Sequence, residues 1–358
     1  MFNWNIKESP ILSLLGMGGG AGSNLVSGGA GAAHVEVLFA QFNDTYEAAH
    51  NGYIESPTLV LTPDIQYLYV LGTGGGGGGG WANSNDNGRG GGGGAGSIRL
   101  MTGYSIPGPS QGSPIKVRVG DGGQAGYHGG TTQILINNGT VFQMNYGSTG
   151  NENGGPGGTV SAPGLSRLPA FPSNNEATGG AGGNGGQRSG SPGQNGNAGP
   201  NGGCGGGGGG GAHVSNKPAG NGGQSGPGST SYNLVQQSQS IASFANPYPI
   251  TLNGTSGGSK SNATGGGEVT PGGDVLLAQG GSGHGADGNT GSSAGAGAGI
   301  RVQTPDSPSP AKYRGGGGGG IRGYIQAPLD QPVLRGWGGG GFIIVIGSSY
   351  ELVSGVDY

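Results

Sequence analysis

Apolar and polar residues alternate most clearly in PIKVRVG, residues 114–120. Its three β-branched residues share one face while Lys116 and Arg118 share the other, which is the period of a strand with one buried face. Two further β-rich runs are HVEVLFAQF, residues 34–42, and FIIVIGSSYELV, which begins at Phe342. No long window carries an apolar stripe with a period of 3.6 residues, so the sequence predicts a mainly β protein with little α-helix.

A hairpin is expected in TTQILINNGTVFQMNYG, residues 131–147. Two β-type runs flank Asn137, Asn138 and Gly139, and an Asn–Gly pair supplies the positive φ angles that a tight hairpin turn requires. These residues therefore predict two adjacent antiparallel strands.

Composition changes this picture. Glycine accounts for 96 of the 358 residues, against about 7% in an average protein. Charged residues make up 9%, whereas a disordered chain pairs low hydrophobicity with high charge. Between residues 147 and 341 glycine recurs in GGX and GXX steps, and only residues 193–202 keep the strict period of three that a collagen triple helix needs.

Uninterrupted glycine runs lie next to the predicted strands. An extended left-handed helix of three residues per turn has no internal hydrogen bonds, so its backbone groups must pair with neighbours, and glycine permits that approach. Each bond contributes about 1 kcal/mol net, and ordering a residue costs about 1–2 kcal/mol, so flanking strands would have to hold such rods. We expect successive rods at residues 74–80, 90–94, 205–211, 315–320 and 338–341, with residues 81–89 and 230–256 as loops or hairpins at the rod ends.

Charge and cysteine content exclude several classes. The net charge is −3 and the 14 Lys and Arg residues are scattered singly, so no basic stripe for nucleic acid is expected. The apolar segment at residues 11–17 is too short to span a bilayer, and no membrane insertion is expected. Cys204 is the only cysteine, so no internal disulfide and no cysteine zinc site can form. It is either a small residue within a glycine run or one half of an intermolecular disulfide.

No motif in the chain predicts catalysis, a cofactor or a metal. GTSGG at residues 254–258 fits G-x-S-x-G but follows no apolar strand. No glycine run continues into GK[ST], as a phosphate-binding loop would. GGSGHGADG at residues 280–288 lacks the aspartate placement of a calcium repeat, and the five histidines are far apart. These segments therefore give no candidate catalytic, cofactor or metal site.

Four segments in order resemble a known family: SPTLVLTPDIQYLYVLGTGGGGGGG, GGGGGAGSIRLMTGY, IKVRVGDGGQAGYHGGTTQI and GWGGGGFIIVI. Together they resemble the glycine-rich domain of bacteriophage tail-fibre and other virion proteins, which also occurs in some animal receptor ectodomains. The resemblance covers residues 54–346, with the middle matched in composition only. It implies a β-sandwich, similar to a jelly-roll or TNF-like fold, that carries inserted polyglycine II helices packed side by side. Because the chain has no cysteine-rich region, membrane span or kinase, the phage members are favoured.

The resemblance also implies an organisation and a role, and a protein that is not an enzyme. Residues 1–33 would be a segment that attaches to other virion proteins, and residues 34–358 the glycine-rich β-sandwich, with polyglycine insertions over about 147–341. Phage adhesins of this type bind a host-surface receptor through loops at the tip of the bundle, so a glycan or outer-membrane-protein receptor and a location on the virion, outside the cell, are expected. Both a homotrimer and a single cap are compatible with the sequence.

Aromatic residues in polar segments are the candidate receptor contacts: Trp81, Tyr232, Phe244 and Tyr248. Exposed aromatic rings on rigid loops give a large contact area at a low entropy cost. Alternatively, these rings cap the rods and shield them from water. Two other functions remain open: a capsid or tail decoration protein with a purely structural role, and an extracellular glycine-rich antifreeze or matrix protein.

Overall fold

The computed structural model describes residues 34–43, 46–47, 52–80, 91–124, 126–151, 154–168, 176–185, 192–200, 203–209, 221, 223–225, 229–234, 248–253, 297, 299–303, 312–319 and 336–358. The chain divides into two units, Met1–Ala32 and Ala33–Tyr358, and all described residues belong to the second. The expected attachment segment, residues 1–33, lies outside the described residues.

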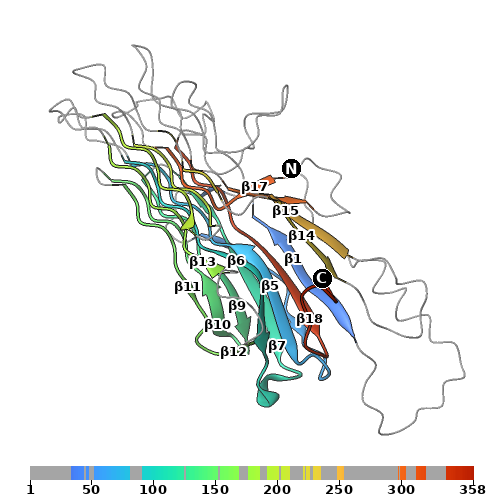
Figure 1. Cartoon of the computed structure of the whole chain (residues 1–358). Helices are drawn as coiled ribbons and strands as arrows, with labels where there is room; N and C mark the ends of the chain where they lie inside the picture. Colours follow the sequence, from blue (N-terminus) through green and yellow to red (C-terminus); the bar gives the residue numbers. More distant parts are fainter. Residues whose placement is uncertain are drawn as a thin grey trace, which may run out of the picture. The chain divides into compact units, whose positions relative to one another are not determined.

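The second unit is mainly β, and its described strands form three antiparallel sheets and one small parallel pair (Figure 1). The central sheet has the order β1 (Val35–Phe42), β18 (Phe342–Ser348), β5 (Tyr67–Thr73), β6 (Ile98–Ser105) and β12 (Ser166–Arg167), with β13 (Glu176–Ala177) also paired to β6. The polar sheet has the order β11 (Val160–Ser161), β10 (Gly139–Met144), β9 (Thr132–Ile136), β7 (Pro114–Gly120) and β3 (Tyr53–Glu55), with β4 (Leu59–Val60) also paired to β7.

A third sheet, the covering sheet, consists of β14 (Ser229–Leu234), β15 (Tyr248–Asn253), β16 (Ile300–Gln303) and β17 (Lys312–Arg314). The parallel pair is β2 (Tyr46–Glu47) with β8 (Gly122–Gly123). The helical element whose bounds are described is the short 3-10 turn η1 (Gly108–Ser110).

Two hydrophobic cores lie on opposite faces of the central sheet. Leu68, Val70, Ile343 and Val345 pack with side chains of the polar sheet in one core. The alternate residues Tyr69, Leu71, Ile344 and Ile346 pack in the other core with Ile250, Leu252, Ile300 and Val302 of the covering sheet. Because both faces of β18 are covered, all seven of its residues are buried, which explains its unbroken apolar run.

The covering sheet includes part of residues 230–256, for which the sequence predicts a loop or hairpin at the end of a glycine rod. β14 and β15 pair as antiparallel neighbours, as a hairpin requires. They differ from the expectation in location, because they belong to a sheet that closes the second core. Two residue pairs of this hairpin, Thr230–Leu252 and Tyr232–Ile250, lie two positions apart and therefore share one face. The side chains of Tyr232, Ile250 and Leu252 on that face are buried toward the central sheet.

The strand and hairpin predicted from alternation are confirmed. Ile115, Val117 and Val119 of β7 are fully buried. β9 and β10 form the expected hairpin, but the positive φ angles fall on Asn137 (52°) and Asn138 (62°), and Gly139 already belongs to β10. The loop is thus two residues long with both residues left-handed, a geometry that asparagine tolerates better than most residues.

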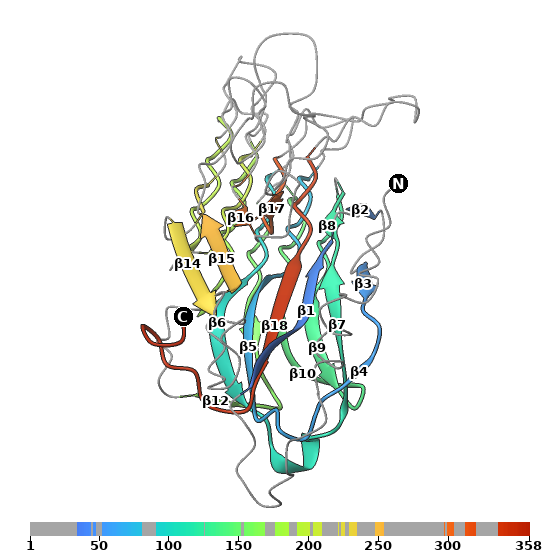
Figure 2. The same cartoon turned by 90° about the vertical axis from the view of Figure 1, so that its right-hand side faces the viewer.

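Glycine segments continue from the ends of the strands (Figure 2). Residues 74–80 follow β5 and residues 91–97 lead into β6, while residues 315–319 follow β17 and residues 336–341 lead into β18. Residues 74–80 are thus a glycine segment where the sequence predicts the first rod, on the N-terminal side of the insertion range of about 147–341.

Candidate functional site

The backbone amides of residues 74–80 all donate hydrogen bonds to other segments, over N···O distances of 2.6–3.0 Å. Every third amide is directed at the same neighbour. Gly74, Gly77 and Gly80 donate to residues 91–97, Gly75 and Gly78 to residues 127–130, and Gly76 and Gly79 to residues 336–339. When the donor moves three residues forward in the chain, its acceptor moves three residues backward. These neighbours therefore run antiparallel to residues 74–80.

Carbonyl groups of the same run accept hydrogen bonds from three further segments. Gly147 and Gly150 donate to Gly75 and Gly78, Gly123 and Gly126 donate to Gly76 and Gly79, and Gly318 donates to Gly77. Six described segments therefore bond to residues 74–80. Residues 91–97 are bonded in the same way to 74–80, 145–151, 155–158, 180–183, 207 and 315–318. We call the segments joined by these bonds the glycine bundle.

Side chains have no room at the inner glycine positions of the glycine bundle. A Cβ atom at Gly77 would lie 2.1 Å from the carbonyl oxygen of Ser148, and one at Gly76 would lie 1.9 Å from that of Gly316. Real Cβ atoms essentially never approach a heavy atom closer than 3.0 Å. Glycine at these positions is thus required by the close approach of neighbouring backbones.

The glycine pattern of a segment follows its position in the glycine bundle. Every residue of 74–80 and 91–97 is buried, and these are the segments with nearly uninterrupted glycine. In residues 192–200 only Gly193, Gly196 and Gly199 are partly buried, and the other residues are exposed. A segment surrounded on all sides needs glycine at nearly every position, whereas a segment at the surface needs it once per three residues. This difference accounts for the collagen-like stretch.

A cluster of polar groups fixes the base of the glycine bundle, where strands change into glycine segments. The Thr132 hydroxyl donates to the Thr73 carbonyl (2.8 Å) and accepts from the Gly120 amide (3.1 Å). The Asn43 side chain donates to the Val119 carbonyl (2.7 Å) and to Asp121, and Arg314 donates to the Asn43 carbonyl. These contacts join the ends of β1, β5, β7 and β17.

Cys204 is fully buried at this level. Its thiol donates to the Arg314 carbonyl over 3.4 Å, and burial raises the pKa of the thiol to about 12. A Cβ on Gly315 would lie 3.0 Å from the sulfur. Since Cys204 has no exposed surface in this unit, it acts as a packed small residue in the structure.

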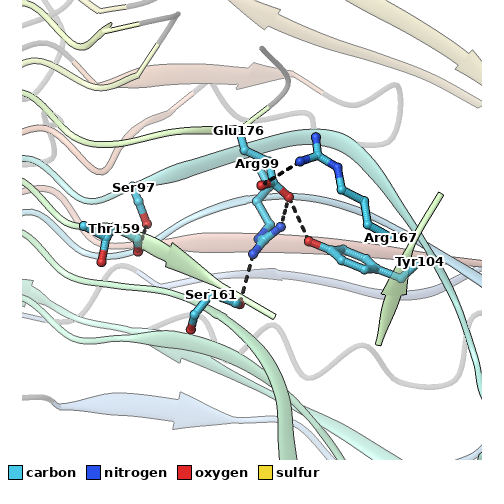
Figure 3. A network of polar contacts seen from close by, with 7 residues as sticks. All are labelled: Ser97, Arg99, Tyr104, Thr159, Ser161, Arg167 and Glu176. Atoms are coloured by element: carbon cyan, nitrogen blue, oxygen red, sulfur yellow. Dashed lines mark hydrogen bonds and ion pairs between the residues drawn. The ribbon is translucent and has the colours of Figure 1, made fainter. Parts of the chain in front are cut away.

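An ion pair anchors β13 to the central sheet (Figure 3). Arg99 is 1% exposed and donates to Glu176 and to the Ser161 carbonyl (3.0 Å), while the Tyr104 hydroxyl donates to the same carboxylate over 2.8 Å. Burial lowers the pKa of Arg99, and the charge of Glu176 opposes that effect. The sequence carried no signal for this pair because 77 residues separate its members.

At the opposite end of the glycine bundle, several glycine segments reach the last residues that the structure describes. The Gly80 amide donates to the Gly91 carbonyl (2.8 Å), and the Gly79 amide to the Gly336 carbonyl (2.6 Å). The Gly91 amide in turn donates to the Asn151 carbonyl. The residues that flank segments 81–90, 152–153 and 320–335 are therefore neighbours at one level, which we call the distal end.

The four candidate contacts are not brought together among the described residues. Trp81 and Phe244 lie outside the described residues, and only the backbone of Tyr248, in β15, is described. Tyr232 is 7% exposed and its ring lies 6.0 Å from that of Tyr358. Burial raises its pKa to about 12. The expectation of an exposed ring is therefore wrong for Tyr232, because β14 directs it into the second core.

Within the described part of the chain, no group of three or more His, Cys, Asp or Glu side chains is placed to hold a metal ion. In the same residues no helix has the length and apolar character needed to cross a membrane. No family model matches the chain, and no curated protein matches it. The function is therefore inferred from the residues and their arrangement.

Proposed function

We propose that this protein is a non-enzymatic structural protein of a bacteriophage virion, and that it serves as a tail-fibre tip or adhesin. The observation that carries the proposal is the distal end, where the flanks of three connecting segments are held at one level by backbone hydrogen bonds. The resemblance of residues 54–346 to glycine-rich phage domains supports the same assignment. In this account the sandwich is the base and the distal segments meet the host surface.

The proposal also covers the conformation of the glycine segments and the kind of sandwich. We propose that the glycine segments are polyglycine II helices, and that the sandwich is of the jelly-roll or TNF-like kind. The three-residue period of the hydrogen bonds supports the helix assignment, since a helix with three residues per turn directs every third amide the same way. At about 3.1 Å per residue, residues 74–80 would carry the chain roughly 20 Å from the end of β5.

A laterally bonded bundle suits receptor binding. Segments that start from fixed ends lose less conformational freedom on binding than free loops, and that loss otherwise subtracts from affinity. The sequence of residues 81–90 is WANSNDNGRG, and residues 320–335 contain Tyr324 and three arginine or aspartate side chains, Arg322, Asp330 and Arg335. Trp81 is the first contact to test because its position directly follows Gly80. Phe244 and Tyr248 remain proposed contacts, and Tyr232 does not.

The structural alternative is a capsid or tail decoration protein. It would use the same rigid bundle as a spacer and would need no receptor contact at the distal end. The buried polar base and the two cores are equally compatible with that role, so the distal segments separate the two functions.

The test uses the virus that encodes the chain. Residues 81–90 are replaced by a short turn, which the Gly80–Gly91 hydrogen bond allows, and adsorption to host cells is measured. Pro109→Ala in η1 serves as the control. Loss of adsorption with unchanged particle assembly, together with distal-fibre labelling by an antibody against the chain, supports the adhesin. Unchanged adsorption with label spread over the capsid or tail shaft favours decoration, and absence from the particle would return the extracellular alternative.

A further inference from the structure

The outward face of the polar sheet carries a row of hydrogen-bonded amides. Gln133 in β9 donates to Gln143 in β10 (2.9 Å), and Gln143 donates to Asn145 (2.8 Å). Asn145 in turn donates to the Thr159 hydroxyl (2.8 Å). The three amide side chains are half-buried and Thr159 is exposed, so the amides are held in place yet reachable from solvent. We call this row the amide ladder.

Two aromatic rings lie near the amide ladder, those of Tyr53 and Tyr146. Arg118, the cross-strand neighbour of Gln133, stacks on Tyr53 with 4.6 Å between its guanidinium carbon and the ring centroid. Tyr146 directly follows Asn145 in the chain, and its ring lies 5.4 Å from that of His128. The His128 Nδ1 accepts the Thr149 amide (2.9 Å), which fixes the imidazole on the bundle surface.

We propose that this face binds an acidic oligosaccharide, a chain of sugars that carries carboxylate groups. Side-chain amides both donate and accept, and each keeps capacity beyond the ladder: Gln143 spends one of its two N–H groups on Asn145. Sugar hydroxyls, which likewise donate and accept, match this chemistry. The partly exposed rings supply surfaces for the apolar faces of sugar rings.

The charge of the face selects an acidic sugar. Lys116 and Arg118 both contact Glu55, at 3.0 Å and 2.6 Å. Hydrogen bonds from Arg118 and then Lys116 lower the pKa of Glu55, which stays ionised. Lys116 and Arg118 therefore outnumber the single carboxylate of Glu55, so this face has a local excess of positive charge. The chain as a whole has a net charge of −3. A carboxylate on the ligand complements that excess.

Pre-organisation favours binding at this face. Freezing a long polar side chain on binding subtracts from the affinity. The amide ladder has already fixed Gln133 and Gln143 in the free protein, and both stand on strands rather than on loops. The ligand therefore meets donors and acceptors whose directions are set beforehand.

The inference does not depend on the proposed function, because it is tested on the purified full chain without virus or host. The probes are a hexamer of galacturonic acid and uncharged cellohexaose, with binding measured by calorimetry at low and high salt. We expect the acidic hexamer to bind, and salt to weaken that binding through screening.

Variants make the test specific. Gln143→Glu places a negative charge in the amide ladder and should weaken binding of the acidic hexamer about tenfold. Tyr146→Ala should weaken it as well, while Val356→Ser, on an exposed side chain of the C-terminal turn, should leave it unchanged. Circular dichroism and melting establish that each variant is folded. Absence of binding by the unaltered chain, unchanged binding by Gln143→Glu, or equal binding of cellohexaose would overturn the assignment.

Discussion

The guanidinium carbon of Arg99 lies 5.2 Å from the ring centroid of Tyr104, on the same face of β6. Two residues separated by an odd number of positions face opposite sides of a regular strand. Here Val70 pairs with Thr102 but Gly72 pairs with Arg99, so Leu71 opposes two residues and β6 contains a bulge. Met101 within it has φ of 52°. The bulge brings Arg99 and Tyr104 to one side, where both bond Glu176.

Removing the carboxylate of Glu176 should therefore be costly. Glu176→Ala leaves the charge of Arg99, which is 1% exposed, without its partner, and we expect a loss of about 3–5 kcal/mol in the free energy of unfolding. Arg167→Ala, which removes a more exposed ion pair at 3.5 Å, should cost at most about 1 kcal/mol. Denaturant unfolding of both variants measures the difference. Equal losses would mean that Glu176 does not compensate the buried charge.

Glycine-to-alanine substitutions should separate bundle positions from other glycines. At Gly77 a Cβ would meet the Ser148 carbonyl oxygen at 2.1 Å, whereas at Gly108 it would meet nothing within 4 Å. Gly77→Ala should lower stability by about 3 kcal/mol or more, because backbones must separate. Gly108→Ala should remain within about 0.5 kcal/mol of the unaltered chain. A melting curve for Gly77→Ala that matches the Gly108→Ala control would contradict the close packing of the glycine bundle.

The β9–β10 turn offers a test of backbone conformation alone. Asn138 is exposed and has φ of 62°, so its replacement changes the backbone preference without removing a buried side chain. Asn138→Val should cost about 1–2 kcal/mol, since a β-branched residue is disfavoured in the left-handed region. Asn138→Gly should be at least as stable as the unaltered chain. Thermal melting compares the two, and a Val variant as stable as the Gly variant would refute the turn geometry.

Alkaline pH should expose the contribution of Cys204. Burial raises the pKa of its thiol from an ordinary 9.0 to about 12. The folded state therefore keeps its proton after the unfolded state has lost it, so the stabilisation is complete below about pH 9 and is lost as pH rises toward 12. Cys204→Ala should show a smaller loss of stability over that range. In the native protein at neutral pH the thiol should resist a thiol-specific reagent and react only on unfolding; rapid reaction would contradict its burial.

Sequence patterns predicted those parts of the fold that depend on local order. The alternation in residues 114–120 and the hairpin at residues 131–147 are of this kind, because period and turn chemistry are local. The Arg99–Glu176 pair and the bulge at Met101 were not predictable, since they depend on which distant strands meet. Tyr232 was misjudged because its strand lies in a glycine-poor insertion whose burial comes from the central sheet. The spacing of glycine along the sequence distinguishes the inner glycine segments from the outer ones.

Hydrogen exchange at residues 74–80 tests the central claim most directly. Glycine runs in an unfolded chain exchange their amides within moments, whereas amides that all donate to neighbouring segments exchange only when the bundle opens. We expect residues 74–80 and 91–97 to be protected to a degree similar to β5 and β18, and Gly77→Ala to remove protection in both runs. Free exchange of these glycine amides alongside protected strands would contradict a hydrogen-bonded glycine bundle that holds the distal end.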